Sequence, residues 1–353
     1  MKRSFLRSII FAALFWPLEN NAADFMAGVA AYKRGDFPGA LEIFRPLAGD
    51  GDARAQFALG LLHDNGEGVV RSDEQAAHWY ALSAAQGYPK AQYNYGLLIE
   101  NERVAALVKA SASQWYFKAA SGGNSDAVGR LFRLAENGDR SSQSLLGTLF
   151  MNGRGVVKDA GKALGWFVKA AKQGDVDAHF ALGVLYETGQ AQRQSFTKAA
   201  EHYQISAAAG HLEAIYNLGR FYRVGRGTAR DFERARAHYT TAAEGGLPIA
   251  QFALGMLFEA GQQGWPQDPE QALHWYQKAV ENGSGDAMVN LAFFYMRGEH
   301  VAQDLDRAAS LLREAQRLGH PLAGENLEVI NSAAATPAAM NVASYDAVEN
   351  ASK

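Results

Sequence analysis

The stretch AQFALGLLHDNGEGVVRSDEQAAHWYALSAAQG, residues 55–87, contains the pattern that decides the fold. Its first part places Ala55, Leu59 and Leu62 at positions i, i+4 and i+7, which form one stripe along an α-helix. Its second part repeats this spacing around the pair Trp79-Tyr80, and a glycine-rich turn lies between the two parts. The stretch therefore predicts a helix, a turn and a second helix.

The same pattern recurs along the chain. The first string ends at Gly60, Gly96, Gly147, Gly183, Gly219, Gly255 and Ala292, in steps of 36, 51, 36, 36, 36 and 37 residues. The second string has its anchor pair at Trp79-Tyr80, Trp115-Tyr116, Trp166-Phe167, His202-Tyr203, His238-Tyr239, Trp275-Tyr276 and Leu311-Leu312. A fixed period of 36 residues with two helical segments predicts an all-α array of helix–turn–helix repeats.

These repeats divide the chain. One helical hairpin leaves too much apolar surface exposed to be stable alone, so the units are expected to stack on one another. We expect two repeats over residues 52–123, an extra single helix over 124–138 and five repeats over 139–319. A shorter capping hairpin over 24–51 precedes them, and a capping helix over 320–330 follows them. The Ala/Ser/Asn-rich residues 331–353 are predicted to be disordered.

The first 23 residues are typical of a secretory signal peptide. A basic start (Lys2, Arg3 and Arg7) precedes a short apolar run that ends at Pro17, and the small residues Ala22 and Ala23 follow. The apolar run is shorter than the roughly 20 residues that a membrane-spanning helix needs. We therefore expect export to the periplasm, cleavage after Ala23, and no transmembrane span in the mature chain. An uncleaved anchor is the alternative interpretation.

Charge and composition exclude several classes of protein. The 353 residues contain 34 Lys and Arg against 37 Asp and Glu, a net charge of −3. Residues 1–23 contribute +3 from Lys2, Arg3 and Arg7 and −1 from Glu19, so the mature chain carries −3 − 2 = −5. A chain of this charge gives no electrostatic reason to expect nucleic-acid binding. The absence of cysteine excludes disulfides, thiolate-bound metals and a cysteine nucleophile.

The recurring residues resemble a known family. The first repeat reads Ala55, Leu59, Gly60, Gly66, Gly68, Val69, Ala76, Trp79, Tyr80, Ala84 and Gly87, and most of these positions recur in the other repeats. This pattern is similar to the SEL-one-like repeat family, a branch of the tetratricopeptide superfamily. The resemblance implies a right-handed α-solenoid that binds proteins or peptides in its concave groove and has no chemistry of its own. Ala292, Leu311-Leu312, His202 and His238 depart from the pattern.

No catalytic or metal-binding motif is present in the sequence. The nine histidines form neither a His-Glu-x-x-His nor a His-x-His pattern. A nucleophile elbow, a penicillin-recognising Ser-x-x-Lys-type motif and a phosphate-binding Walker loop are also absent from the sequence. We therefore predict that the protein is not an enzyme and has no catalytic residue, metal or cofactor.

Two sets of residues are candidates for partner binding. Asn94, Asn217 and Asn290 occupy one position of the first helix of their repeats, where three other repeats have Ala58, Ala181 and Ala253. Asparagine can clamp a peptide backbone there. Six arginines crowd the fifth repeat, and among them Arg220, Arg223 and Arg226 are candidates to bind an acidic partner segment. The alternative interpretations are solvated helix positions for the asparagines and a salt-bridged surface for the arginines.

The sequence leaves three functions open. The resemblance favours a periplasmic scaffold that binds a protein or peptide partner in a cell-envelope complex or regulatory pathway. A binder of cell-wall glycan fragments, or a component of exopolysaccharide machinery, is the alternative. A hydrolase acting on β-lactam-like substrates ranks last, because the sequence offers no nucleophile and base pair.

Overall fold

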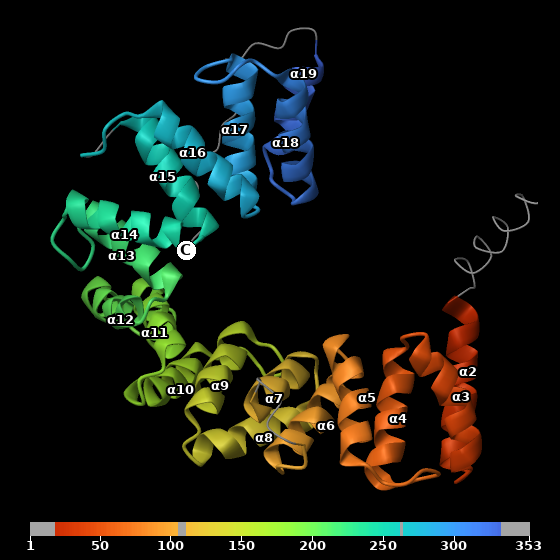
Figure 1. Cartoon of the computed structure of the whole chain (residues 1–353). Helices are drawn as coiled ribbons and strands as arrows, with labels where there is room; N and C mark the ends of the chain where they lie inside the picture. The colour runs from red at the N-terminus through yellow and green to blue at the C-terminus, as the bar shows by residue number, and fades with distance from the viewer. Residues whose placement is uncertain (1–17, 105–110, 262–263, 333–353) are drawn as a thin grey trace, which may run out of the picture. The chain divides into compact units, whose positions relative to one another are not determined.

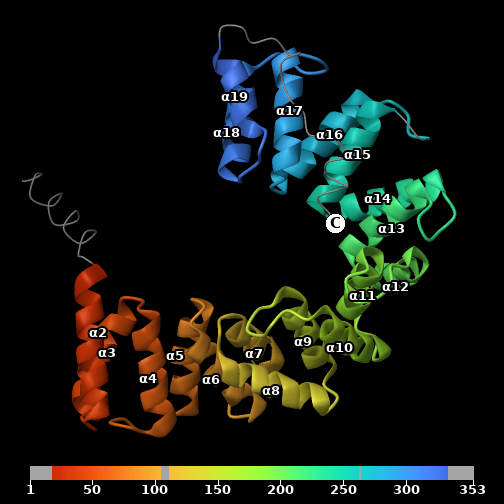
Figure 2. The same cartoon turned by 180° about the vertical axis from the view of Figure 1, so that it is seen from behind.

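The computed structural model describes residues 18–104, 111–261 and 264–332 (Figures 1 and 2). In these ranges the chain forms 18 α-helices and no strand, which confirms the all-α prediction and its helix–turn–helix repeats. Most of the predicted signal peptide (residues 1–17) and of the predicted disordered tail (333–353) lies outside the described residues.

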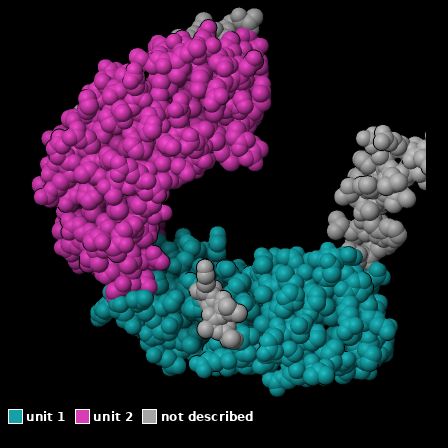
Figure 3. Space-filling model, viewed as in Figure 1, with its two compact units in different colours: residues 1–173 teal, residues 174–353 magenta. Residues whose placement is uncertain are grey.

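The helices fall into two compact units, which are residues 1–173 and 174–353 (Figure 3). The first unit contains α2 (Leu18–Lys33), α3 (Phe37–Gly49), α4 (Ala53–Asn65), α5 (Asp73–Ala85), α6 (Pro89–Glu100), α7 (Ala112–Ser121), α8 (Ser125–Glu136), α9 (Arg140–Asn152) and α10 (Ala160–Lys172). The second unit contains α11 (Val176–Thr188), α12 (Phe196–Ala208), α13 (Leu212–Val224), α14 (Phe232–Glu244), α15 (Pro248–Ala260), α16 (Pro269–Glu281), α17 (Gly285–Arg297), α18 (Leu305–Arg317) and α19 (Ala323–Asn331).

The irregular segments of the sequence each hold helices. Residues 124–138 hold the single helix α8, and α9 contacts both α7 and α8. At the N-terminal end, α2 begins at Leu18, six residues before the start of the hairpin expected over 24–51. At the other end α19 extends to Asn331 and packs on α18.

The repeat sequence specifies where helices begin and end. In the first complete repeat the carboxylate of Asp52 accepts hydrogen bonds from the backbone N–H groups of Arg54 and Ala55, which satisfies free donors at the start of α4. The same helix ends at Gly66, whose φ of 74° is the left-handed conformation that glycine adopts without strain. Equivalent caps recur, so each helix length is set locally.

In five of the seven repeats the hairpin is closed by an aromatic ring that lies on a glycine. The second residue of the anchor pair packs against the glycine that ends the first string, in the pairs Gly60–Tyr80, Gly96–Tyr116, Gly147–Phe167, Gly183–Tyr203 and Gly255–Tyr276. A Cβ atom on any of these glycines would lie 2.5–2.7 Å from the ring. In the last repeat Leu312 replaces the ring, and Ala292 replaces the glycine. The close packing of the ring therefore leaves room only for glycine at this position of the first helix.

Consecutive hairpins are joined by a glutamine in the first helix of four repeats. The side-chain amide of Gln56 donates to the carbonyl oxygen of Ala48, 3.2 Å away, at the end of the preceding helix. The same bond joins Gln92 to Ala84, Gln143 to Ala135 and Gln251 to Ala243. Each of these carbonyls also accepts from the glycine amide of the following turn, so the glutamine adds a second donor. The bonds strengthen the stacking of neighbouring repeats within each unit.

The ring and glycine contact leads to a stability prediction. Gly183→Ala would place its Cβ about 2.5 Å from Cδ1 and Cε1 of Tyr203. We expect the variant to lose about 1–3 kcal/mol of unfolding free energy through overpacking, measured by urea denaturation followed by circular dichroism.

Gly165→Ala is the matched control. Gly165 lies inside α10, and a Cβ there would meet no atom within 4 Å. Since alanine has the higher helix propensity, this variant is expected to gain up to about 1 kcal/mol. Equal effects of the two variants would show that the ring does not set the requirement for glycine.

Candidate functional site

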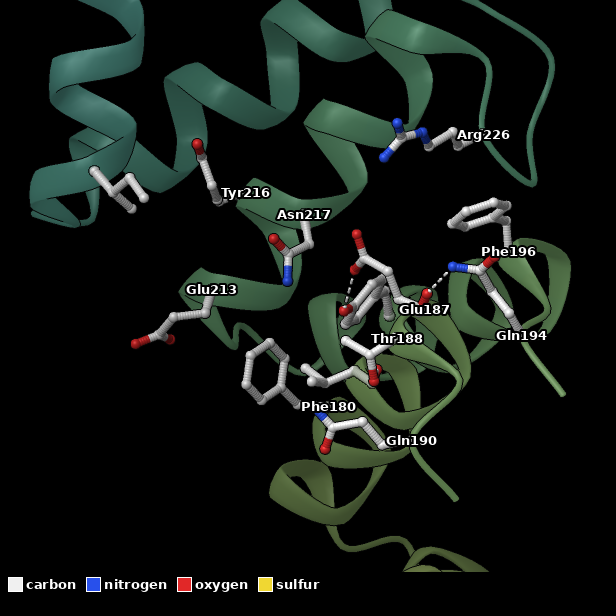
Figure 4. Close-up of a pocket in the computed structure, with 13 residues that line it drawn as sticks. Phe180, Glu187, Thr188, Gln190, Gln194, Phe196, Glu213, Tyr216, Asn217 and Arg226 are labelled. Carbon is white, nitrogen blue, oxygen red and sulfur yellow. Dashed lines mark hydrogen bonds between the residues drawn. The ribbon is translucent and has the colours of Figure 1, made fainter. Parts of the chain in front are cut away.

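A cavity of about 590 Å³ lies in the second unit, between α11 and α13 (Figure 4). Its walls come from these two helices, from the turn after α11, from Phe196 at the start of α12 and from Ile249 at the start of α15. Its size is within the range of roughly 300–1,000 Å³ that is usual for ligand sites.

One wall of the cavity is apolar and follows from the repeat. Phe180 and Tyr216 occupy the same position in consecutive repeats, so both project from first helices into the cavity. The ring of Phe180 lies 5.8 Å from that of Tyr203 and stacks on His211 at 4.4 Å between ring centroids. Val184 and Ile249 complete this wall. The wall can accept an apolar side chain of a partner.

The floor of the cavity is a buried polar network. The hydroxyl of Tyr203 donates to Oε2 of Glu187 at 2.7 Å, and Nη2 of Arg220 lies 3.4 Å from Oε1 of the same carboxylate. Arg220 also donates to Oδ1 of Asn217 at 3.1 Å. The Arg220 side chain is only 2% exposed and that of Glu187 11%, so the two charges compensate each other out of water.

Burial and the neighbouring Glu187 carboxylate raise the pKa of the Tyr203 hydroxyl far above its usual range. The hydroxyl therefore stays protonated and acts as a hydrogen-bond donor at every physiological pH. The same causes raise the pKa of Tyr80, Tyr116 and Tyr276.

These tyrosines share one arrangement that the sequence analysis missed. Each donates to a carboxylate about 16 residues earlier, in the pairs Tyr80–Asp64, Tyr116–Glu100, Tyr203–Glu187 and Tyr276–Glu259. Where the ring residue has no hydroxyl, as in Phe167 and Leu312, the position 16 residues earlier holds methionine, Met151 or Met296. Comparison of the repeats at this spacing would have revealed the pairs. Tyr239 departs from the rule, because Arg223 stands opposite it.

The three predicted asparagines each join such a network. Asn94 donates to the Tyr80 hydroxyl at 3.1 Å, Asn290 donates to that of Tyr276 at 3.3 Å, and Asn217 accepts from Arg220 at 3.1 Å. Each asparagine stands 14 residues after its tyrosine. Asn290 is 4% exposed, and of the three only Asn217 lines the cavity. The amides of Asn94 and Asn290 therefore position internal hydroxyls, and contact of the three asparagines with a partner stays a prediction.

The predicted arginine patch is not one exposed surface. Arg220 and Arg223 are buried, because the helical period of α13 turns both towards the interior of the repeat. Arg226 lies in the turn after α13 and lines the cavity, with its guanidinium 5.4 Å from the centroid of the Phe196 ring. Arg234 pairs with Asp231, the N-cap of α14, and Arg236 pairs with Glu233 on the same helix. The structure thus brings Asn217 and Arg226 to one cavity, with Arg220 beneath them.

Two histidines occupy positions where other repeats have tryptophan. His202 stacks on Tyr186 and His238 on Tyr222, each at 5.5 Å between ring centroids. Burial lowers the pKa of both rings, and the neighbouring His179 and Arg234 lower it further. Nδ1 of His202 lies 3.0 Å from Nδ1 of His179.

Over the described ranges, no group of three or more His, Asp or Glu side chains is arranged to hold a metal ion. In the same ranges, no helix combines the length and the apolar character that crossing a bilayer requires.

The Sel1 repeat model matches the chain seven times, at residues 53–88, 89–124, 140–175, 176–211, 212–247, 248–284 and 285–320. One similar solved structure is a protective antigen present in uropathogenic Escherichia coli strains, which displays an SLR fold. It is 32% identical over 88% of this chain, with a TM-score of 0.50, and this chain spans only 64% of that antigen. A Sel1 repeat protein from Oxalobacter formigenes is 28% identical over 88% of this chain and 86% of its own, with a TM-score of 0.53. Among curated proteins, none matches.

The tyrosine and carboxylate pairs are open to a double-mutant test. Tyr276→Phe removes a buried donor from Glu259, and Glu259→Met removes the acceptor. Each single variant is expected to lose about 1–3 kcal/mol, because it leaves one polar group unsatisfied. The double variant recreates the Met151–Phe167 pair of the third repeat, so it should lose clearly less than the sum in urea unfolding. Strict additivity would contradict a direct interaction.

The buried histidines predict a pH dependence of stability. Because the folded-state pKa of His238 is below the unfolded value of about 6.5, the unfolded chain binds protons first as the pH falls. Stability is therefore complete above about pH 6.5 and declines as the pH drops towards the folded pKa. We expect the free energy of unfolding of His238→Gln to fall less than that of the wild type between pH 7.5 and 5. Urea denaturation at several pH values in this range measures the difference.

The matched control is His274→Gln, on the exposed face of α16 in another repeat. This variant should keep the full decline of the wild type. An unchanged decline in His238→Gln would show that the buried ring does not contribute to it.

Proposed function

This chain belongs to the Sel1 repeat family, and from that membership we propose that it is an exported, non-enzymatic scaffold that holds a segment of a partner protein in the cavity between α11 and α13. Sel1 repeat proteins generally mediate protein–protein interaction. The proposal goes further in naming a place on the molecule and a compartment.

The observation that supports the place is the lining of the cavity. An apolar wall formed by Phe180, Tyr216 and Ile249 lies beside polar groups from Asn217 and Arg226. Binding sites for peptides combine such an apolar anchor surface with a few polar groups that fix orientation. The walls come from helices of three successive hairpins, so the cavity is preformed on rigid elements.

The observation that supports the compartment is the N-terminal sequence. The order of basic start, short apolar run, Pro17 and small residues Ala22 and Ala23 is typical of a signal peptide that is removed on export. The absence of cysteine is compatible with an oxidising compartment, because such a chain cannot form wrong disulfides there. We therefore place the scaffold and its partner in the periplasm as part of an envelope complex.

The test uses a photo-crosslinking residue, p-benzoylphenylalanine, in the full-length chain expressed in its bacterial host. Ile249→p-benzoylphenylalanine puts the crosslinker at the cavity wall. Ultraviolet light should yield one dominant crosslinked species in the periplasmic fraction, identified by mass spectrometry. Deletion of residues 2–23 should retain the chain in the cytoplasm and abolish this species.

The matched control is Ile205→p-benzoylphenylalanine. Ile205 lies on α12 of the same unit, is 51% exposed and does not line the cavity. If both positions return the same set of abundant proteins, the cavity does not hold a specific partner. If the dominant product of position 249 appears in the cytoplasm, the proposed compartment is wrong.

A further inference from the structure

We propose that the cavity between α11 and α13 selects a partner segment in which an acidic side chain stands beside an apolar one, with the carboxylate bound by Arg226. This inference rests on the proposed function and specifies the chemistry of the segment that is held. It follows from the charges, the free donors and the apolar surface of the cavity.

Three charged side chains line the cavity, and two of them are already accounted for. The carboxylate of Glu187 accepts the Tyr203 hydroxyl and pairs with the buried Arg220. The carboxylate of Glu213 is 55% exposed, lies 3.3 Å from Nδ1 of His211 and points away from the other lining residues (Figure 4). Arg226 is therefore the charge that remains for a ligand.

The guanidinium of Arg226 points into the cavity (Figure 4). It stands 5.4 Å from the centroid of the Phe196 ring, and it forms no ion pair with any carboxylate in the described part of the chain. Its backbone is fixed, because the N–H of Arg226 donates to the carbonyl of Phe221 at 3.1 Å. A guanidinium supported by an aromatic face presents a planar set of donors, which suits a carboxylate.

The cavity favours a side-chain carboxylate over the carboxylate of a chain terminus. Capture of a terminus commonly uses several free backbone N–H groups together. Here the turn amides of Gly189, Gly225 and Arg226 already donate to helix carbonyls, at 2.8–3.1 Å. The single free guanidinium fits one acidic side chain, and the wall formed by Phe180, Tyr216 and Ile249 fits an apolar neighbour.

The test compares four pools of hexapeptides by isothermal titration calorimetry with the full mature chain. Three pools are acetylated and amidated and carry a central Leu-Glu, Leu-Gln or Leu-Lys pair between randomised neutral residues. The fourth carries Leu-Gln and a free terminal carboxylate. We expect the Leu-Glu pool to bind about tenfold more tightly than the Leu-Gln pool at low salt, and this advantage should shrink as salt rises.

Two variants locate the preference. Arg226→Gln should bind the Leu-Glu and Leu-Gln pools equally, with an unchanged melting temperature, because its side chain forms no internal ion pair in the described residues. The matched control Arg236→Gln removes an exposed arginine that pairs with Glu233, and it should keep the tenfold preference.

The inference is overturned if the Leu-Gln or Leu-Lys pool binds as tightly as Leu-Glu, if the free-terminus pool binds most tightly, or if Arg226→Gln keeps the preference. Absence of binding by all four pools also overturns it. The scaffold proposal fails separately, in the crosslinking at position 249. If all pools bind equally and Ile249→Arg abolishes that binding, the cavity still holds a peptide. The scaffold proposal then stands, and only the preference for an acidic side chain is wrong.

Discussion

The contact between an aromatic ring and a glycine is the constraint on which the rest of the molecule depends. In five hairpins the ring of the second helix lies so close to the first that a single added carbon would collide with it. This approach buries the ring fully and fixes the distance between the helices. In the last repeat Ala292 replaces the glycine and Leu312 replaces the aromatic residue, so both members of the contact change together.

Burial of a tyrosine at this contact creates a further requirement. Its hydroxyl lies where water cannot reach, so it needs an acceptor from the protein. A carboxylate on the facing helix supplies one, and the buried carboxylate in turn needs compensation. In the fourth repeat Arg220 provides it from α13, the first helix of the next repeat, where it also bonds Asn217. This arrangement brings polar groups to the floor of the cavity. The candidate site is thus a consequence of core packing.

Much of the fold could be predicted from the sequence, because the period of the repeat determines helix, turn and stacking together. The interior partners could not be predicted from one repeat alone. Arg220 and Arg223 looked like exposed cations in a linear reading, and only the orientation of α13 shows that they face inwards. Asn217 was predicted as a contact for a partner, and the structure also shows its side-chain oxygen accepting a hydrogen bond from the buried Arg220. The cavity depends on side chains from four helices, which no single motif encodes.

The hydroxyl and carboxylate pairs have an evolutionary consequence. Donor and acceptor of each pair belong to the same hairpin, as in Tyr276 and Glu259. A hairpin copied or lost by recombination would therefore bring or remove the hydroxyl and its carboxylate together. The compensating cation can belong to the following hairpin, as Arg220 does for Glu187, so the neighbouring repeat would have to change as well. The number of repeats in such an array can therefore change by whole hairpins. The side chains that line one cavity can change separately and bind a different partner.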